Sequence, residues 1–343
     1  MNVSRQTAIA TLMLLCLFIL SACGNENVVS KADEASIKTD KTSPIQTTII
    51  GGRTGGAWSI FTEGIAESIR RNNVGSMITV EPGGIVENPP TVGVNKIPYG
   101  LSYAMTAYAA YIGEEPYERA YEDIRAVSVV IPANYYQFVV PADVPFDSFE
   151  EIVENQVALR LAVDQKGSAG EIITRNIFES YGVSYDDITT WGGSVDYLGG
   201  SKAFEMMSDH RIDATGDAVS VPSSDIIEAS TILDLKIIAL SQETVQVVSE
   251  KLGMEPNTIE AGSYTFLDED LNTLSTQAIL MVHKDVPEEE VYQVTKSIYD
   301  NLEYLGNVHE EFKKLIAEKM TDVGNVPLHP GAETFFREQG LIE

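Results

Sequence analysis

The sequence predicts an α/β protein made of two lobes with a ligand cleft between them. Strand and helix patterns alternate in two successive blocks, and an extended segment connects the first block to the second. Glycine-containing turns follow strands in both blocks. Because ligands of open α/β sheets bind beyond the carboxyl ends of the strands, we expect these turns to face each other across the cleft.

The first block contains three predicted strands, at residues 47–50, 77–82 and 99–105. A helix is predicted over residues 57–71, because Trp58, Phe61, Ile65 and Ile69 recur at spacings of three and four. Residues 126–131 and 135–141 are typical of two strands, or of one long strand interrupted at Pro132. This extended segment is the predicted crossover.

The second block contains strands at residues 160–165, 188–191, 213–220 and 235–240, with helices at 168–181 and 195–209. A late strand at 275–284 and two helices within 287–320 follow. Because the late strand returns toward the first block, we expect one lobe to comprise residues 45–137 and 281–343. The other lobe is then residues 138–280.

The N-terminal residues 1–22 are typical of a secretion signal, with Arg5 before an apolar run at residues 8–20. That run is shorter than the roughly 20 residues that a membrane-spanning helix needs. The LSAC sequence at residues 20–23 resembles a bacterial lipobox, so we expect Cys23 to carry a lipid, such as palmitate, that anchors the exported protein to the membrane. The alternative is an ordinary signal followed by a chance cysteine. Residues 23–44 are polar and without period, which predicts a flexible tether.

The charge balance is strongly acidic, with 23 Lys and Arg residues against 51 Asp and Glu residues and a formal net charge of −28. Such a field repels nucleic acid and anionic membrane surfaces, so neither is expected as a binding partner. The charge is dispersed along the chain, and the local field of a ligand site can oppose it.

The loop GGRTGGAW at residues 51–58 is the first candidate for ligand binding. Glycines let the backbone approach a ligand, and the free N–H groups at the start of the following helix favour an anion. The loop lacks the Lys and hydroxyl of a P-loop. The candidate ligand-binding residues are Arg53, Thr54, Gly55, Gly56, Ala57 and Trp58. The alternative is that the glycines only turn the chain and that Arg53 is a solvated loop residue.

Further candidates lie in later turns and at strand ends. They are Gly83, Gly84, Ile85 and Asn88; Lys166, Ser168, Ala169 and Gly170; Asp217, Ala218 and Ser220; and the aromatic residues Tyr103, Tyr136 and Trp191. Ser168 and Glu171 also form an S-x-x-E capping box, which explains them without a ligand. Packing or hinge roles are equally consistent with the aromatic residues. We expect Trp58 and Trp191, the only two tryptophans, to lie on opposite walls of the cleft.

Five segments in order resemble the TAXI receptors, the TRAP-associated extracytoplasmic immunogenic proteins. The segments are GGRTGGAWSIFTEGIAESI, VEPGGIVEN, AVDQKGSAGEIITRNIFESYGVSYDDI, RIDATGDAVSVPSSDI and VPLHPGAETFFREQG. The resemblance extends from about residue 46 to the C-terminus. It implies a type II periplasmic-binding-protein fold and capture of a small organic anion, such as a dicarboxylate, keto acid or amino acid. It also implies delivery to the membrane subunits of a TRAP transporter.

The chain departs from the family pattern at three positions. Arg53 stands where the family loop normally has a small residue, while Ile85 and Gly170 replace hydroxyl residues of the next two turns. Two hydroxyl donors are thus missing and one cation is added. This predicts either that Arg53 restores the anion contact or that the pocket takes a less polar molecule.

Three other functions compete with that of a TRAP receptor. A binding protein of an ABC importer or a chemoreceptor partner would have the same physical pattern, whereas a purely structural surface protein would not need paired glycine turns. An enzyme finds little support, since GxSxG and HExxH motifs are missing and His210, His283, His309 and His329 lack metal-ligand spacing. We therefore expect no enzyme, no metal and no cofactor.

Overall fold

The computed structural model describes residues 43–52 and 54–343. The signal peptide, Cys23, nearly all of the tether and Arg53 lie outside the described residues, so what the sequence predicts for them stays a prediction. Within residues 43–52 and 54–343, no helix is both long and hydrophobic enough to cross a membrane.

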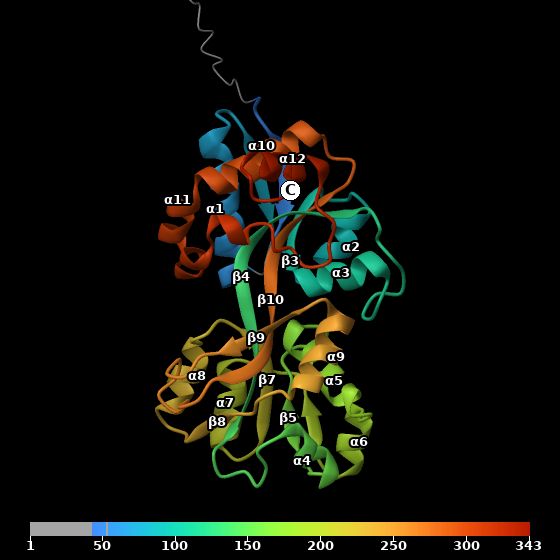
Figure 1. Ribbon diagram of the computed structural model, residues 1–343, viewed down its shortest axis with the longest axis vertical. Helices are drawn as coiled ribbons and strands as arrows, with labels where there is room; N and C mark the ends of the chain where they lie inside the picture. Colours follow the sequence, from blue (N-terminus) through green and yellow to red (C-terminus); the bar gives the residue numbers. More distant parts are fainter. Residues whose placement is uncertain (1–42, 53) are drawn as a thin grey trace, which may run out of the picture. The chain divides into compact units, whose positions relative to one another are not determined.

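Two long antiparallel strands connect two groups of elements (Figure 1). These are β4 (Ile124–Pro141) and β10 (Leu271–His283). The residues from Ala278 to Val282 pair with β3, whereas Tyr135 to Val139 pair with β7. We call the group around β3 the first lobe and the group around β7 the second lobe. The crossover predicted at Pro132 is thus one continuous strand.

The first lobe covers its strands with helices from both ends of the chain (Figure 1). It contains β1 (Gln46–Ile50), α1 (Ala57–Asn72), β2 (Met77–Glu81), α2 (Asn88–Gly93), β3 (Tyr99–Tyr103), α3 (Ala104–Ile112), α10 (Glu288–Asp300), α11 (Leu302–Val308), η1 (Glu310–Lys314), η2 (Ala317–Lys319) and α12 (Pro330–Glu338). Strand β1 pairs in parallel with both β2 and β3.

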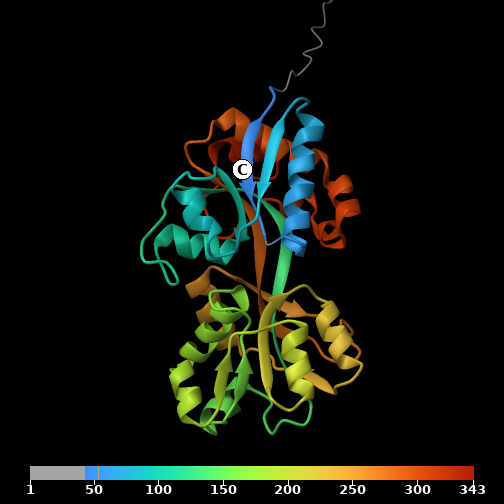
Figure 2. The same cartoon turned by 180° about the vertical axis from the view of Figure 1, so that it is seen from behind.

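The second lobe repeats this arrangement, with β5 in parallel between β6 and β7 (Figure 2). It contains α4 (Phe149–Glu154), β5 (Arg160–Ala162), α5 (Ala169–Ser180), α6 (Tyr185–Thr190), β6 (Ser194–Asp196), α7 (Ser201–Ser208), β7 (Ala214–Val219), α8 (Ser224–Ser230), β8 (Leu235–Ile237), α9 (Gln242–Leu252) and β9 (Glu255–Ile259). The described strands form one ten-stranded sheet, in the order β2-β1-β3-β10-β4-β7-β5-β6, with β8 on β4 and β9 on β10. The predicted α/β class is confirmed, while the residue boundaries predicted for the lobes stay a prediction.

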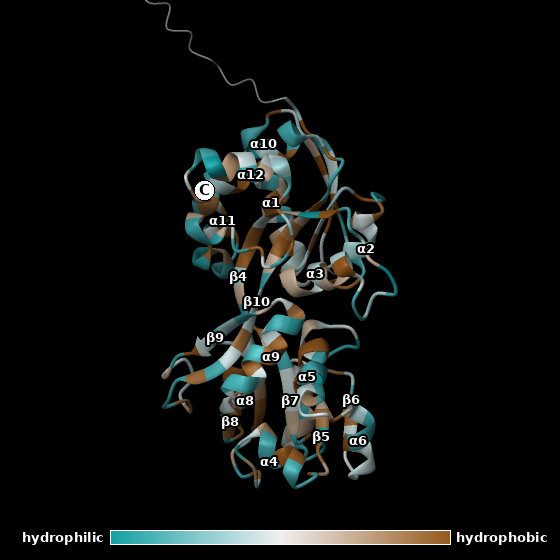
Figure 3. Ribbon diagram, turned by 45° about the vertical axis from the view of Figure 1, so that its right-hand side comes forward, coloured by the Kyte–Doolittle hydropathy of each residue, from teal (hydrophilic) through white to brown (hydrophobic). Residues whose placement is uncertain are grey.

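Hydrophobic residues concentrate on the central strands, and helices such as α9 and α10 turn hydrophilic residues outward (Figure 3). Helix α1 shows the principle, since Phe61, Ile65 and Ile69 are buried on the face that the spacing predicts. Trp58, in the same row, is only half-buried because it lies at the first turn of the helix.

The ladder between β4 and β10 is irregular where it passes between the lobes. Asn134 pairs with Thr276 and Ile131 with Ala278, so Pro132 and Ala133 lie opposite Gln277 alone. This is a β-bulge, and proline is tolerated there because it has no N–H to donate to the ladder. The bulge lies between the part of the ladder that pairs with β3 and the part that pairs with β7.

Two predicted elements of the second lobe are wrong. Residues 188–191 lie in or directly after helix α6 and not in a strand, because Ser184 and Asp187 form a reciprocal capping box that starts a helix. The helix predicted over 195–209 is instead strand β6 followed by the shorter helix α7. Gly200, with φ +59°, separates the two. Helices α3, α4, α8, α9 and α12 were not predicted.

Candidate functional site

A cavity of about 320 Å³ lies between turns of the first lobe and the loop that follows β5 in the second lobe. Its lining residues are Gly52, Gly56, Ala57, Trp58, Gly83, Gly84, Ile85, Val86, Glu87, Asp164, Gln165, Lys166, Gly167 and Ser168. Three of the predicted loops therefore meet at one place. Each follows the carboxyl end of a strand, as expected for an α/β sheet.

The first-lobe wall is the beginning of α1. Gly56 caps the helix in an extended conformation without a side-chain hydrogen bond, so the first N–H groups of α1 lack a capping side chain. The Trp58 ring packs edge-on against Tyr103, with 5.0 Å between ring centroids. Gly52 is required here, since a Cβ on it would lie 2.2 Å from Trp58 Cβ. This wall combines a helix N-terminus with an aromatic surface.

The second-lobe wall is the beginning of α5. Ser168 accepts a hydrogen bond from the N–H of Glu171 at 3.2 Å, and the Glu171 carboxylate accepts one from the N–H of Gly167 at 3.1 Å. Ser168 is thus the N-cap of α5, but the predicted capping box is not reciprocal, because Glu171 accepts from Gly167 and not from the N–H of Ser168. Ser168 also lines the cavity. Lys166 is exposed on the same wall, and no described carboxylate forms an ion pair with it.

The deeper part of the second-lobe wall is acidic. Asp164 lines the cavity, and Asp217 lies beside it because β5 and β7 are parallel with Ala162 opposite Thr215. Burial, followed by the negative charge of Asp164, raises the pKa of Asp217 to about 7. The N–H of Ala218 donates to Asp217 at 2.7 Å, and this hydrogen bond opposes the rise.

Packing on this wall explains why a glycine lies at position 170. A Cβ on it would lie 2.8 Å from both Asp217 Oδ1 and the carbonyl oxygen of Gly216. The hydroxyl residue that the family pattern has at this position does not fit against Asp217 here. Both the backbone of β7 and the Asp217 side chain therefore leave no room for a side chain at position 170.

The chain matches a known protein family over most of its length. Residues 49–340 match the model of the NMT1-like family. The chain belongs to the NMT1-like family.

Solved structures show which known folds this NMT1-like chain is similar to. It is similar to a TctC solute-binding protein from Polaromonas, with a TM-score of 0.52 and 16% identity over 88% of this chain and 99% of that one. It is also similar to XAC2383 from Xanthomonas citri bound to ATP, with a TM-score of 0.51 and 11% identity over 86% of this chain and 96% of that one. At this identity the likeness concerns the fold, which is that of periplasmic solute-binding proteins.

Of the predicted site residues, those that line the cavity are Gly56, Ala57, Trp58, Gly83, Gly84, Ile85, Lys166 and Ser168. Those outside its lining are Thr54, Gly55, Asn88, Tyr103, Tyr136, Ala169, Gly170, Trp191, Asp217, Ala218 and Ser220. Asp164, Gln165 and Glu87 line it and were not predicted. Asp164 and Gln165 end a predicted strand and Glu87 lies in a glycine turn, and these positions were the available signal.

The expectation that Trp191 faces Trp58 is wrong. Trp191 precedes β6, which runs parallel to β5, whereas the cavity lies beyond the carboxyl end of β5. Trp191 therefore lies at the amino ends of the second-lobe strands, whereas the cavity lies beyond their carboxyl ends. Tyr136 is fully buried, and its hydroxyl forms a 2.9 Å hydrogen bond with Thr174 Oγ1, which is a packing role.

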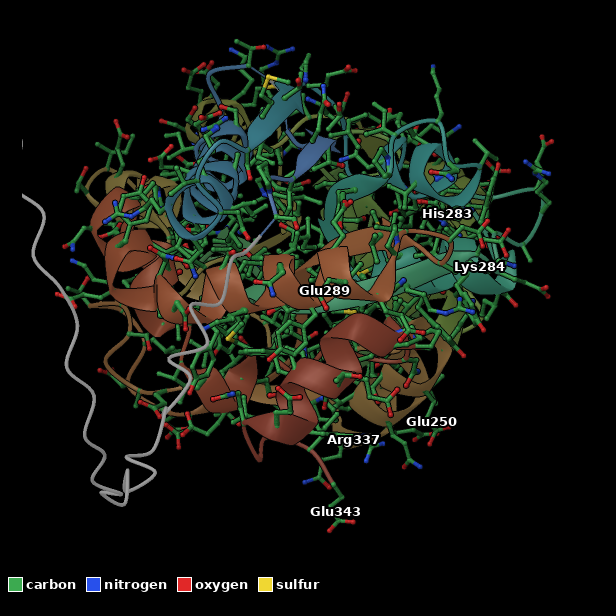
Figure 4. The ribbon with its side chains drawn as sticks, turned by 90° about the horizontal axis from the view of Figure 1, so that it is seen from above. Glu250, His283, Lys284, Glu289, Arg337 and Glu343 are labelled. Atoms are coloured by element: carbon green, nitrogen blue, oxygen red, sulfur yellow. The ribbon has the colours of Figure 1, made fainter. Side chains whose placement is uncertain are left out.

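Three of the histidines form hydrogen bonds or are buried, whereas His210 is exposed. His329 accepts from the N–H of Gly331 at the start of α12, and His309 accepts from the N–H of Glu311. His283 is buried at the end of β10 beside Lys284, away from Arg337 and Glu343 near the C-terminus (Figure 4). Among residues 43–52 and 54–343, no three His, Cys, Asp or Glu side chains converge in a way that would hold a metal.

Asn88 holds the first-lobe turns together instead of facing the cavity. Its side-chain nitrogen donates to the carbonyls of Gly51 at 2.9 Å and Leu101 at 2.7 Å, and its oxygen accepts from the N–H of Gly84 at 3.1 Å. Asn88 is fully buried. It joins the loop after β1, the turn after β2 and strand β3.

We predict that Asn88→Ala lowers the free energy of unfolding by about 2–3 kcal/mol, because buried backbone groups lose their partners. Asn307→Ala is the matched control, since the exposed Asn307 side chain donates only to the carbonyl of Glu303 on its own helix. It should change stability by less than about 0.5 kcal/mol. Urea denaturation measures both, and equal stability of the two variants would contradict this role of Asn88.

Proposed function

We propose that the protein is an extracytoplasmic solute receptor that closes its two lobes on a small molecule and delivers it to a membrane transporter. The observation that carries the proposal is the cavity itself, which is lined by turns of both lobes while β4 and β10 connect the lobes. A hinged clamp of this kind buries its ligand by a rotation of one lobe on the other. The likeness in fold to a TctC solute-binding protein supports it.

We further propose a TAXI-type receptor that serves TRAP membrane subunits and is held at the membrane by a lipid on Cys23. The five segments in the order of the TAXI pattern and the LSAC sequence support this assignment. A receptor for an ABC importer or a chemoreceptor is the alternative, and an enzyme is a distant third. No cofactor is part of the proposal.

The proposed ligand is a small organic molecule with at least one carboxylate. The N-termini of α1 and α5 both face the cavity, and helix N-termini favour negative charge by roughly 0.3–1 kcal/mol when exposed and up to about 2 when partly buried. Lys166 adds a cation to this region. We propose Arg53 as a second one, from its place in the sequence of the first loop.

Closure is the first test of this function. Ligand should reduce the radius of gyration in solution scattering and change the fluorescence of Trp58, which lines the cavity. A panel of carboxylic acids and amino acids supplies the ligands. Trp191→Phe should keep the fluorescence change and Trp58→Phe should lose it. A bound ligand that leaves the scattering profile unchanged would refute the clamp.

Arg53→Ala tests the carboxylate contact. A hydrogen bond to a charged group contributes about 1.5–3 kcal/mol, so affinity should fall roughly 10- to 100-fold by calorimetry. Arg53→Lys should recover only part, since an ammonium lacks the planar fork of a guanidinium. Arg211→Ala, at an exposed arginine outside the cavity lining, is the control and should bind normally. Unchanged affinity of Arg53→Ala would make Arg53 a solvated loop residue.

A further inference from the structure

A second cavity, of about 690 Å³, lies between the lobes at the level of the β-bulge. Its first-lobe wall consists of the end of η1, part of η2 and residues 321–325, and its second-lobe wall includes residues 255–257 of β9. Pro132 of the bulge and Gln277, which lies opposite it, line the cavity as well. We call this the rear cavity, and the cavity of the candidate site the solute cavity.

The strand order places the two cavities on opposite sides of the connecting strands. In the first lobe, the solute cavity is lined by turns after β1 and β2, which lie beyond β3 on the β10 side. The segment that lines the rear cavity lies beyond β4, because the N–H of Val129 donates to the carbonyl of Met320 and Ala126 pairs with Leu328. In the second lobe, β5 lies on the β4 side and β9 on the β10 side. A rotation about β4 and β10 that brings the walls of the solute cavity together therefore moves the rear walls apart.

One hydrogen bond joins the two walls of the rear cavity. The Nζ atom of Lys314, in η1 of the first lobe, donates to the carbonyl oxygen of Val221, after β7 of the second lobe, at 3.2 Å. Within its own lobe, Lys314 has a longer contact with Glu311, at 3.5 Å. Hydrogen bonds from charged donors are stronger than those from neutral donors. This bond requires the present angle between the lobes, and it breaks when the rear walls separate.

The hinge beside this bond contains a polar atom without a partner. Gln277 is only 5% exposed, and its side-chain oxygen accepts no hydrogen bond from any described residue. It lies opposite Pro132, which has no N–H to donate. A buried acceptor without a partner costs free energy. The present angle between the lobes therefore carries a cost at the hinge, which contacts between the lobes such as that of Lys314 offset.

We propose that Lys314 sets the affinity of the receptor for its solute from outside the solute cavity, by holding the rear walls together and so opposing closure. This inference rests on the proposed receptor function. A solute that binds the closed form must break the hydrogen bond between Lys314 and Val221, so its apparent affinity is lower than its affinity for the closed form. The bond forms again on opening and favours release of the solute. Lys314 is thus a positioning residue that acts through the angle between the lobes.

Lys314→Ala should tighten solute binding. Without this bond the balance shifts toward the closed form, so the dissociation constant should fall about two- to tenfold, mainly through slower dissociation. Lys313→Ala is the matched control, because Lys313 is exposed in the same short helix and forms no ion pair with any described residue. It removes the same charge and should bind like the parent. Calorimetry and stopped-flow kinetics measure both variants with each carboxylic acid or amino acid that binds the parent. An affinity of Lys314→Ala equal to or below that of Lys313→Ala overturns the proposal.

Ile316→Trp should tighten binding by a different route. Ile316 is 51% exposed and lines the first-lobe wall of the rear cavity. A larger side chain there resists the approach of the rear walls, so it favours closure around the solute. Ile232→Trp, at a 71% exposed position of the second lobe outside the rear cavity lining, is the control and should bind like the parent. Melting curves verify folding. An affinity of Ile316→Trp equal to or below that of its control contradicts the opposed motion of the two cavities.

Scattering of the ligand-free variants separates failure of this inference from failure of the receptor function. Ligand-free Lys314→Ala should have a smaller radius of gyration than ligand-free Lys313→Ala, because its lobes close more often. If compounds bind with closure but Lys314→Ala has no effect on affinity or scattering, the receptor stands and the inference is overturned. If no compound binds, the receptor function fails together with the role of Lys314 in affinity, and the ligand-free scattering still decides whether Lys314 holds the lobes.

Discussion

The antiparallel pairing of β4 with β10 holds the rest of the molecule in place. Strands β3 and β9 pair with β10, and β7 and β8 pair with β4, so both lobes are built outward from these two strands. The bulge at Pro132 interrupts the ladder between the lobes. Contacts between the lobes include the 2.8 Å ion pair of Arg175 with the exposed Glu115 and the packing of α3 against α9. A hinged clamp requires lobes that are covalently connected and can still rotate, and two paired strands with an interrupted ladder between the lobes meet this requirement.

The net negative charge of the chain and the charges that line its cavity both bear on which charge the ligand can have. An anion must approach a protein of formal charge −28, and the helix N-termini and Lys166 offer it only one favourable end of the cavity. The other end presents Asp164 and, behind it, Asp217. Gly170 keeps α5 close to this acidic end, because the carbonyl oxygen of Gly216 and Asp217 Oδ1 leave no room for a Cβ.

The sequence was sufficient for the α/β class, for the extended crossover and for several of the turns that line the cavity. Periodicity located α1 and α5, and glycine turns after strands located their N-termini. Residues 188–191 were misjudged because Ile188, Thr189 and Thr190 have strand propensity, while the deciding signal, the Ser184 cap, lies before them. The pairing of Asp164 with Asp217 could not be foreseen. These residues are distant in sequence, and only the register of β5 on β7 brings them together.

Solution scattering with and without a ligand tests the account most directly. The account predicts that a ligand which binds by calorimetry reduces the radius of gyration, because a rotation about the connecting strands β4 and β10 brings the two lobes together. A ligand that binds and leaves the radius of gyration unchanged would contradict the account.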